Sequence, residues 1–577
     1  MNPIPAIWVH GKCGFGSHGL VKHALEGTLW PTPRPFQFRQ VMGALLQDPK
    51  EGGVVISDWG LKVNDPLLKN YTDKFPWAVF LSTSDEVGGL DWRSIKRPEV
   101  KVWIQMPFAG KHDDVDRRFP IGWHPQTRDH LRKLLISSPP RDLAWSFVGQ
   151  GGPAREECLK ALATMTGGYL LVTGGFHQGL SMEEYLTLLL RTKIAPSPAG
   201  GHSNDTFRTW EALEAGCLPM PSRAGRQDDR GFDYYCAAVE DPPFARVSDW
   251  RTFEMMVTNY LEAPHLLLEH TNRSTAWWLN YKRRFVTDLE DDLMTLGQTP
   301  PETNTLRHLV TVVMTTSPIH LHPSTDMIEA VIRKIRSYPE LAECEVIIGV
   351  DGLSAEQLHH RERYEEYKRQ LIHNCNWKPE LSGVLPVVFS EYSHQSGMMG
   401  TLLSKVRTPV ILFCCHDEAP KGDIDFRGIV NALLKNPTVN VVRPHVYSEL
   451  LPEPSHGRLY LDRSPHVIEG VPLIRTVCWS QRPHLAKTEF YKRMIEDNFG
   501  EDAKVNIEDL MWPILSNQCL YHGVPHEKWG VWIYAPSGDM CRSEHLDGRG
   551  PEKRTQITYA YDGKPPLGAP RAGTVEP

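Results

Sequence analysis

Two short apolar runs that end abruptly in acidic residues constrain the fold of this chain most strongly. The run 410–415 has the composition of a buried strand, and the triplet 416–418, His-Asp-Glu, follows where that strand should end. The run 346–350 has the same character and is followed by Asp351. In open α/β sheets, ligands bind beyond the carboxyl ends of the strands. We therefore expect the two acidic ends to lie on neighbouring strands and to build one site.

Acidic side chains at such an edge suit a divalent cation. Hard cations take oxygen ligands, and Mg²⁺ is commonly held by one or two carboxylates while phosphate oxygens complete its shell. The alternative is that these acids are turn residues or helix caps, which often follow strands. Each motif taken alone leaves both interpretations open.

The order of the segments around these motifs favours a mostly parallel sheet. A strand-like run begins at 308 and another covers 385–391, and helical spacing occupies 326–339 and 397–408 between the strand-like runs. This alternation of strand and helix is typical of β-α-β units. The predicted fold class is therefore α/β.

With these motifs, residues 305–550 resemble the GT-A glycosyltransferases of the family-2 type. The resemblance implies a GT-A domain over 307–550 with a mostly parallel mixed sheet. It also implies a nucleotide-sugar donor that is held by Thr315 on the first strand and by Asp351.

The same resemblance implies a divalent metal, Mn or Mg, in this domain. In the family, DXD-like acids hold the metal; here Asp417 is the natural ligand, with His416 or Glu418 beside it. A late histidine-containing loop contributes a further contact in many such enzymes, and His545 in SEHLDGRG is the candidate. The chain departs from the pattern at Cys415, where a DXD motif has its first Asp.

The residues after position 477 resemble the acceptor side of the family. The segment 477–494 resembles a Trp-Ser-x-x-Pro turn that leads into a helix, with Arg482 where Asn is more usual. In the helix predicted at 505–515, the resemblance places a general base at Glu508 or Asp509. The alternative is that both acids only complement the helix dipole. Because successive helical residues point about 100° apart, only one of them can face the site.

A second set of motifs lies at 144–220. SFVGQGG is a strand that enters a glycine-rich turn before Arg155, an arrangement that favours anions. The pattern R-x-x-E-A-L-x-x-G-C-x-P, which begins at Arg208, resembles the exostosin-type GT-B glycosyltransferases. The resemblance implies that Arg208 meets the donor diphosphate and Glu211 the ribose. An exposed i,i+3 ion pair is the alternative for these two residues.

A GT-B module needs a second Rossmann-like lobe, and residues 1–140 can supply it on the acceptor side. Two predicted strand ends there carry three candidate bases, namely Asp58, Asp85 and Glu86. We therefore expect lobes at 1–140 and 141–295, the second of which binds the nucleotide-sugar without a metal. A linker at 296–306 and a flexible tail at 551–577 complete the predicted organisation.

Charge and cysteine content restrict the partners and the compartment. The net charge of −7 and the absence of a dense basic run disfavour a nucleic-acid acceptor. The 11 scattered cysteines indicate reduced thiols in a bacterial or virus-infected host cytosol. No apolar stretch is long enough for a membrane span.

We therefore expect a cytoplasmic, bifunctional, inverting glycosyltransferase that adds two sugars from nucleotide-sugar donors to a glycan or glycosylated acceptor. Three alternatives remain open. One module is active while the other binds glycan; the chain is a carbohydrate-binding scaffold; or a viral enzyme glycosylates modified bases in DNA, which the charge disfavours. The sequence does not predict the oligomeric state.

Overall fold

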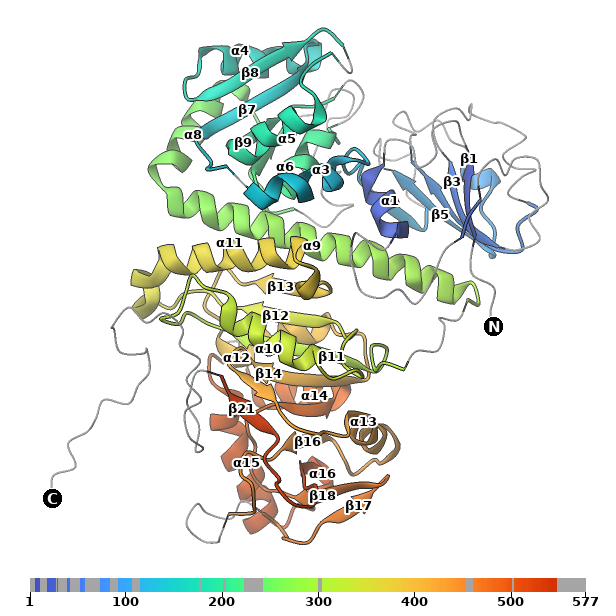
Figure 1. Ribbon diagram of the computed structural model, residues 1–577, viewed down its shortest axis with the longest axis vertical. Coiled ribbons are helices and arrows are strands. Elements are labelled where there is room, and N and C mark those ends of the chain that lie inside the picture. Colours follow the sequence, from blue (N-terminus) through green and yellow to red (C-terminus); the bar gives the residue numbers. More distant parts are fainter. Residues whose placement is uncertain are drawn as a thin grey trace, which may run out of the picture. The chain divides into compact units, whose positions relative to one another are not determined.

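The computed structural model divides the chain into two compact units, Met1–Glu302 and Thr303–Pro577 (Figure 1). The described residues are 6–10, 18–26, 29, 39–41, 52–57, 73–83, 92–105, 115–137, 139–175, 178–200, 204–222, 242–298, 304–451, 460–500 and 503–546. The predicted tail at 551–577 and the candidate bases Asp58, Asp85 and Glu86 lie outside these residues.

The first unit begins with a six-stranded parallel sheet in the order β2-β1-β3-β4-β5-β6. Its strands are β1 (Ala6–His10), β2 (Arg39–Val41), β3 (Gly53–Ser57), β4 (Ala78–Ser82), β5 (Val100–Gln105) and β6 (Arg117–Phe119). The helix α1 (Gly19–Glu26) buries most of its residues. All five residues of β4 are buried, as expected for a parallel strand that is covered on both faces.

A second parallel sheet follows in the same unit, in the order β10-β9-β7-β8. Its strands are β7 (Leu143–Gln150), β8 (Gly168–Thr173), β9 (Thr192–Ser197) and β10 (Leu218–Pro221). On one face, Trp145 and Phe147 of β7 pack with side chains of α4 (Glu156–Thr164) and α8 (Phe253–Glu262). The helices α3 (Thr127–Leu134), α5 (Met182–Arg191) and α6 (Phe207–Glu214) also belong to this part of the chain (Figure 1).

The long helix α9 (Pro264–Thr295) joins the two sheets of the first unit through buried polar contacts. Its Asp292 accepts a hydrogen bond of 2.7 Å from Trp103 of β5. Ten residues earlier in the same helix, Lys282 lies 2.6 Å from Glu214 of α6, which also pairs with Arg128 of α3. Burial raises the pKa of Glu214, but the cations Arg128 and Lys282 outweigh burial and lower that pKa, so the group is held ionised.

The second unit contains a nine-stranded mixed sheet in the order β13-β12-β11-β14-β19-β16-β20-β18-β17. Four strands, β11 (Val310–Thr316), β12 (Val346–Val350), β13 (Val384–Val388) and β14 (Val410–Cys415), run parallel. The remaining strands are β16 (Val441–Pro444), β17 (His466–Ile468), β18 (Val471–Arg475), β19 (His484–Lys487) and β20 (Val531–Tyr534). β19 pairs antiparallel with both β14 and β16, which makes the sheet mixed.

A separate two-stranded ribbon pairs β15 (Glu418–Pro420) with β21 (Ser543–His545). The helices of this unit are α10 (Asp326–Arg336), α11 (Arg361–Trp377), α12 (His394–Ser404), α13 (Phe426–Lys435), α14 (Thr488–Asn498), α15 (Ile507–Tyr521) and α16 (His526–Trp529). Figure 1 shows α10, α11 and α12 beside the parallel strands β11–β13.

The predicted α/β class is confirmed, with parallel sheets in the first unit and a mixed sheet in the second. The prediction that the acidic ends of β12 and β14 lie on neighbouring strands is wrong, because β11 lies between them. Successive β-α-β units extend from β11 to β12 and β13 in one direction. The chain then returns to the other side of β11 to form β14, an order that strand periodicity does not encode.

We predict that Lys282→Met destabilises the first unit strongly. The Lys282 side chain is 0% exposed and that of Lys160 is 72% exposed, yet both make comparable ion pairs with glutamates, Lys160 with Glu156 at 2.7 Å. Breaking a buried pair costs roughly 3–5 kcal/mol, and the lower end is expected because Arg128 still pairs with Glu214. Urea unfolding followed by tryptophan fluorescence measures the loss. Lys160→Met is the matched control and should change little; equal effects of the two variants would contradict this account.

Candidate functional site

The strand order of the second unit creates a topological switch point between β11 and β14. The chain extends from β11 toward β13 on one side and places β14 on the other, and ligands of open α/β sheets bind at the carboxyl edge of such a point. Thr315 of β11 lies in register with Gly349 of β12 and Cys415 of β14, so these strand ends are level with one another. Thr315 and Cys415 therefore mark the edge at which the site is built.

The ribbon of β15 and β21 brings predicted metal ligands together at this edge. Its register places His545 opposite Glu418. His545 Nδ1 is 3.8 Å from Asp417 Oδ2, and His545 Nε2 is 3.5 Å from Glu418 Oε2. Both carboxylates are buried. Two acids that follow β14 and a histidine on the late strand β21 therefore converge.

Two further side chains, which were not predicted from the sequence as site residues, hydrogen-bond to Glu418. Arg482 Nη1 donates to its Oε1 at 2.8 Å, and Ser543 Oγ donates to the same oxygen at 2.9 Å. Arg482 drew attention in the sequence as a departure from a family pattern, and Ser543 lies two residues before His545. No sequence signal linked either residue to Glu418, because the contacts join segments 64 and 125 residues apart.

The helix α15 separates the two candidate bases. Glu508 is half-buried and accepts a hydrogen bond of 2.8 Å from the backbone N–H of Gln481. Asp509 is exposed and accepts a bond of 3.2 Å from Asn506. Glu508 therefore lies against the turn at 479–483, whereas Asp509 interacts with its own helix terminus.

Cys415 is the common neighbour of these acidic groups. Its Sγ is 3.7 Å from the Gln481 carbonyl oxygen, which it faces as a thiol donor. Burial raises the pKa of the Cys415 thiol well above its usual value, and the carboxylates of Asp417 and Glu418 raise it further. Glu508 adds a smaller contribution to the same pKa. Carboxylates that follow β14 and a carboxylate of α15 thus both act on the pKa of one thiol.

The hydrogen bonds of the Asp351 carboxylate mainly stabilise the backbone around it. Its Oδ1 accepts backbone N–H groups of Gly352 and Ser393, each at 2.8 Å, and its Oδ2 accepts that of His394 at 3.0 Å. Burial raises the pKa of Asp351, and the three backbone donors oppose that shift. The carboxylate thus ties the end of β12 to the start of α12. His394 has a φ of 55°, in the left-handed region that non-glycine residues rarely adopt.

His416 lies in the turn after β14 and is half-buried. It is close to the buried His322, whose pKa is lowered first by burial and then by the charge of His416.

The donor set at this edge fits a divalent cation only in part. Within the described residues, no group of three or more His, Cys, Asp or Glu side chains is arranged to hold an ion. A cation that completes its shell with phosphate oxygens needs only one or two protein ligands. Asp417 and His545 suit that arrangement. Glu418 does not, because Arg482 and Ser543 already occupy its Oε1.

In the first unit, the predicted arginines lie at the carboxyl ends of β7 and β9. Arg155 donates to the carbonyl oxygens of Gln150 and Ala199, both at 3.0 Å. Arg208 stacks on Phe147 at 4.1 Å and donates to the Val148 carbonyl oxygen. Within the described residues, the buried Nε of Arg208 has no hydrogen-bond partner.

The two guanidinium groups flank Gly149. A Cβ at that position would lie 2.5 Å from Arg208 Nη2 and 3.6 Å from Arg155 Nη1. Burial lowers the pKa of Arg155 to about 10, and the charge of Arg208 contributes to that shift. Neither arginine forms an ion pair with another described residue. Two neighbouring guanidinium groups that hydrogen-bond to carbonyl oxygens therefore concentrate positive charge at the Gly149 turn.

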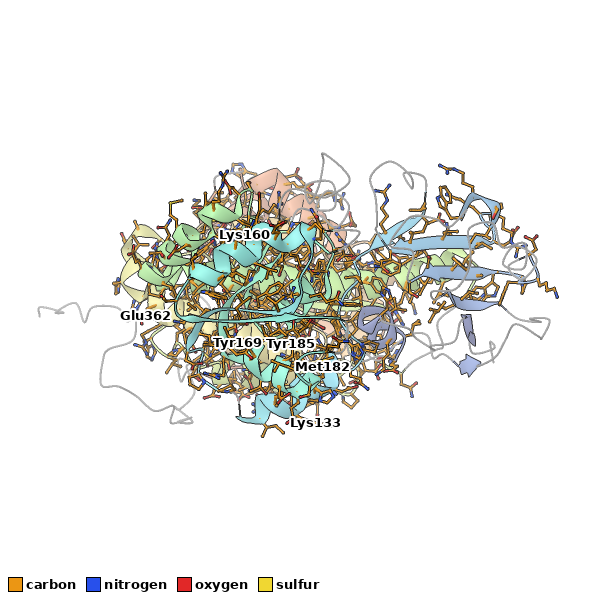
Figure 2. All side chains as sticks on the ribbon, turned by 90° about the horizontal axis from the view of Figure 1, so that it is seen from above. Lys133, Lys160, Tyr169, Met182, Tyr185 and Glu362 are labelled. Atoms are coloured by element: carbon orange, nitrogen blue, oxygen red, sulfur yellow. The ribbon has the colours of Figure 1, made fainter. Side chains whose placement is uncertain are left out.

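Glu211 faces the interior of the same lobe. Tyr185 of α5, labelled in Figure 2, donates to its carboxylate at 3.0 Å, and Thr127 donates at 3.4 Å. Burial raises the pKa of Glu211. The two residues of the predicted pair therefore face different parts of the lobe. Arg208 points to the Gly149 turn, whereas Glu211 accepts hydrogen bonds from α3 and α5.

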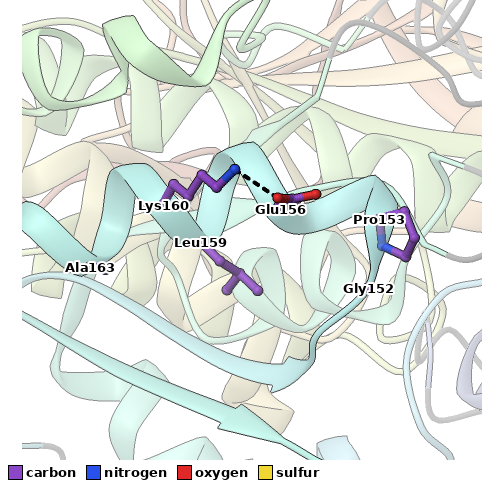
Figure 3. A pocket seen from close by; sticks show the side chains of 6 residues that line it. All are labelled: Gly152, Pro153, Glu156, Leu159, Lys160 and Ala163. Atoms are coloured by element: carbon purple, nitrogen blue, oxygen red, sulfur yellow. Dashed lines mark hydrogen bonds and ion pairs between the residues drawn. The ribbon is translucent and has the colours of Figure 1, made fainter.

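A shallow pocket of about 430 Å³ lies elsewhere on this lobe, beside the first turns of α4 (Figure 3). It is lined by Gly152, Pro153, Glu156, Leu159, Lys160 and Ala163. The two charged residues in its lining, Lys160 and Glu156, are exposed and form an ion pair with each other, so that their charges cancel. None of the predicted site residues lines it.

No family model matches this chain, and no curated protein sequence matches it. Similar solved structures include residues 1–349 of TarS from S. aureus, with 13% identity over 40% of this chain and 59% of that one (TM-score 0.24). GalNAc-T7 with UDP, GalNAc and Mn²⁺ is 11% identical over 41% and 43% (TM-score 0.26). The mannosyltransferase PcManGT from Pyrobaculum calidifontis, with GDP-Man and Mn²⁺, is 14% identical over 48% and 69% (TM-score 0.22).

The chain thus spans less than two thirds of the length of TarS and GalNAc-T7. No described helix of this chain has the length and apolar character of a membrane span.

We predict that Asp351→Ala destabilises the second unit more than Asp425→Ala. Asp351 accepts three backbone N–H groups, whereas Asp425, the N-cap of α13, accepts only Gly428 N–H through its side chain at 2.7 Å. The expected losses are roughly 1.5–3 kcal/mol for the buried charge-assisted set and about 0.5–2 kcal/mol for the cap. Urea unfolding measures both. The reverse order would show that Asp351 is not an anchor of α12.

Proposed function

We propose that the second unit is a GT-A glycosyltransferase that transfers a sugar from a nucleotide-sugar donor to a glycan or glycosylated acceptor with inversion. The observation that carries this proposal is the convergence of Asp417, Glu418 and His545 at the β11–β14 switch point. Gln481 links this edge to Glu508, because its carbonyl oxygen accepts from Cys415 and its N–H donates to Glu508. A donor diphosphate is placed at this carboxyl edge by the general rule for open α/β sheets.

The donor is held by the strand ends in this proposal. Thr315 at the end of β11 faces the nucleotide, and Asp351 fixes the loop that carries Ser393 and His394 beside it. Asp417 and His545 are the residues that would hold a divalent cation, Mn or Mg. When bound, such a cation neutralises the charge of the departing diphosphate.

Glu508 is the proposed general base. The acceptor hydroxyl gives its proton to the Glu508 carboxylate while its oxygen attacks the anomeric carbon. The bond from that carbon to the diphosphate breaks, and the diphosphate leaves with the electron pair. The hydrogen bond from Gln481 N–H holds the carboxylate in place at 2.8 Å. Asp509 has no such role because it is exposed and bonds to Asn506.

The first unit is proposed to be a second, exostosin-like transferase of the GT-B type that uses no metal. Arg155 and Arg208 would bind the donor diphosphate at the Gly149 turn, where their charges lie close together. The complete chain would then be a bifunctional enzyme that adds two sugars in succession in a cytosol.

A second candidate has the first unit bind glycan while only the second unit is catalytic. The internal hydrogen bonds of Glu211 to Tyr185 and Thr127 favour this candidate, because they leave the carboxylate turned away from a ribose. A DNA-directed transferase is disfavoured by the net charge of −7.

We predict that Glu508→Gln and Asp509→Asn differ sharply in sugar transfer. The amide at 508 keeps the shape of the side chain but cannot accept the proton, so transfer should fall about 10²–10⁴-fold. The amide at 509 should leave transfer near the level of the unaltered chain. The measurement is transfer or slow hydrolysis across a panel of nucleotide-sugars. Two mild variants would remove α15 from the mechanism.

We predict that Arg208→Ala weakens binding of a nucleoside diphosphate by the first unit. Loss of one charge-assisted hydrogen bond costs roughly 1.5–3 kcal/mol, or about 10- to 150-fold in affinity. Calorimetry with UDP and GDP on the full chain, with one site fitted for each unit, measures this loss, and Arg155→Ala should behave alike. The exposed Arg191, which pairs with Asp142, is the matched control as Arg191→Ala. Unchanged affinity in both site variants would reject the exostosin-like assignment.

A further inference from the structure

Arg482 is a charged group at the candidate site to which the proposed function gives no role. It belongs to the turn at 479–483, and its neighbour Gln481 touches both Cys415 and Glu508. Its Nη1 donates to Glu418 Oε1, and the carboxylate side chain is only 3% exposed. The guanidinium is therefore fixed at the same edge as Asp417 and His545.

The contacts of the Glu418 carboxylate are those of a group that holds the Arg482 guanidinium in place. Arg482 and Ser543 donate to one oxygen, and His545 lies 3.5 Å from the other. A buried carboxylate is stable when it is paired and hydrogen-bonded in this way. A metal ion at Glu418 would have to compete with Arg482 for the same charge.

Arg482 keeps donors available for a ligand. A guanidinium has five N–H donors in a planar fork, which suits the oxygens of a phosphate. Only Nη1 bonds to a described side chain, and within the described residues Nε and Nη2 make no hydrogen bond. The side chain is 26% exposed. Arg482 thus combines a fixed position with donors that reach solvent at the carboxyl edge.

We propose that Arg482 binds the diphosphate of the donor directly, and that Glu418 is a positioning residue for Arg482 rather than a metal ligand. This inference rests on the proposed function of the second unit. Arg482 stabilises the two phosphate groups through charge-assisted hydrogen bonds, and Ser543 holds the supporting carboxylate in place. The positive charge at the leaving group is then built into the chain, beside any cation at Asp417 and His545.

The test uses the full chain with Arg208→Ala, so that the first unit contributes little, and inorganic pyrophosphate as the probe. Pyrophosphate carries the diphosphate without a base or a sugar, so the unknown identity of the donor does not matter. Calorimetry is performed in EDTA and again in Mn²⁺. Arg482→Gln should bind pyrophosphate roughly 10- to 150-fold more weakly in both conditions.

Two further variants separate direct binding from a structural ion pair. Arg482→Lys keeps the charge but loses the fork, so it should retain part of the affinity. The exposed Arg493 of α14 provides the control, because Arg493→Gln makes the same change of charge on the surface. Unchanged pyrophosphate affinity of Arg482→Gln in both conditions would overturn the proposal.

The role of Glu418 is tested by direct measurement of Mn²⁺ binding. As a positioning residue, Glu418→Gln should weaken pyrophosphate binding in EDTA and leave Mn²⁺ affinity within about twofold, whereas Asp417→Asn should weaken Mn²⁺ binding. Equal loss of Mn²⁺ affinity in both variants would make Glu418 a metal ligand and overturn its assignment. A reference chain that binds neither pyrophosphate, UDP nor GDP would instead reject the proposed function itself.

Discussion

The pairing of β15 with β21 is the interaction on which the candidate site of the second unit depends. This short ribbon places His545 and Ser543 beside the acids that follow β14, although Ser543 and Glu418 lie 125 residues apart in the chain. The backbone bonds of the ribbon fix the register, and the register decides which side chain meets Glu418. The carboxylates remain buried because the partners that arrive on β21 and on the turn at 479–483 compensate their charge.

Each unit brings side chains of like charge close together: carboxylates in the second unit and guanidinium groups in the first. The second unit gathers carboxylates and compensates them with Arg482 and His545. The first unit gathers Arg155 and Arg208 around a glycine, and their recorded hydrogen bonds are to carbonyl oxygens. An anionic ligand would complete the charge balance of the arginine pair directly. In the carboxylate cluster, a fixed guanidinium or a cation must lie between the acids and the anion.

Local patterns predicted much of the fold because short-range physics decides it. The strand at 410–415 and the helix that begins with the acids near 508 form where apolar runs and helical spacing indicate. The order of strands in the sheet could not be predicted, because it depends on the return of the chain to the far side of β11. Because β11 separates β12 from β14, Asp351 does not form one cluster with Asp417. It instead holds the start of α12 through the backbone N–H groups of Ser393 and His394.

The sequence by itself determined the α/β class and the acids at the strand ends, because composition and periodicity are local properties. It also left both Glu508 and Asp509 as candidate bases, with Asp509 slightly behind. Only the tertiary structure decided between their environments, through the Gln481 N–H that holds Glu508 and the exposure of Asp509. The link from Arg482 to Glu418 likewise exists only in the folded chain. Contacts between distant segments depend on which faces pack together, and no local pattern records that choice.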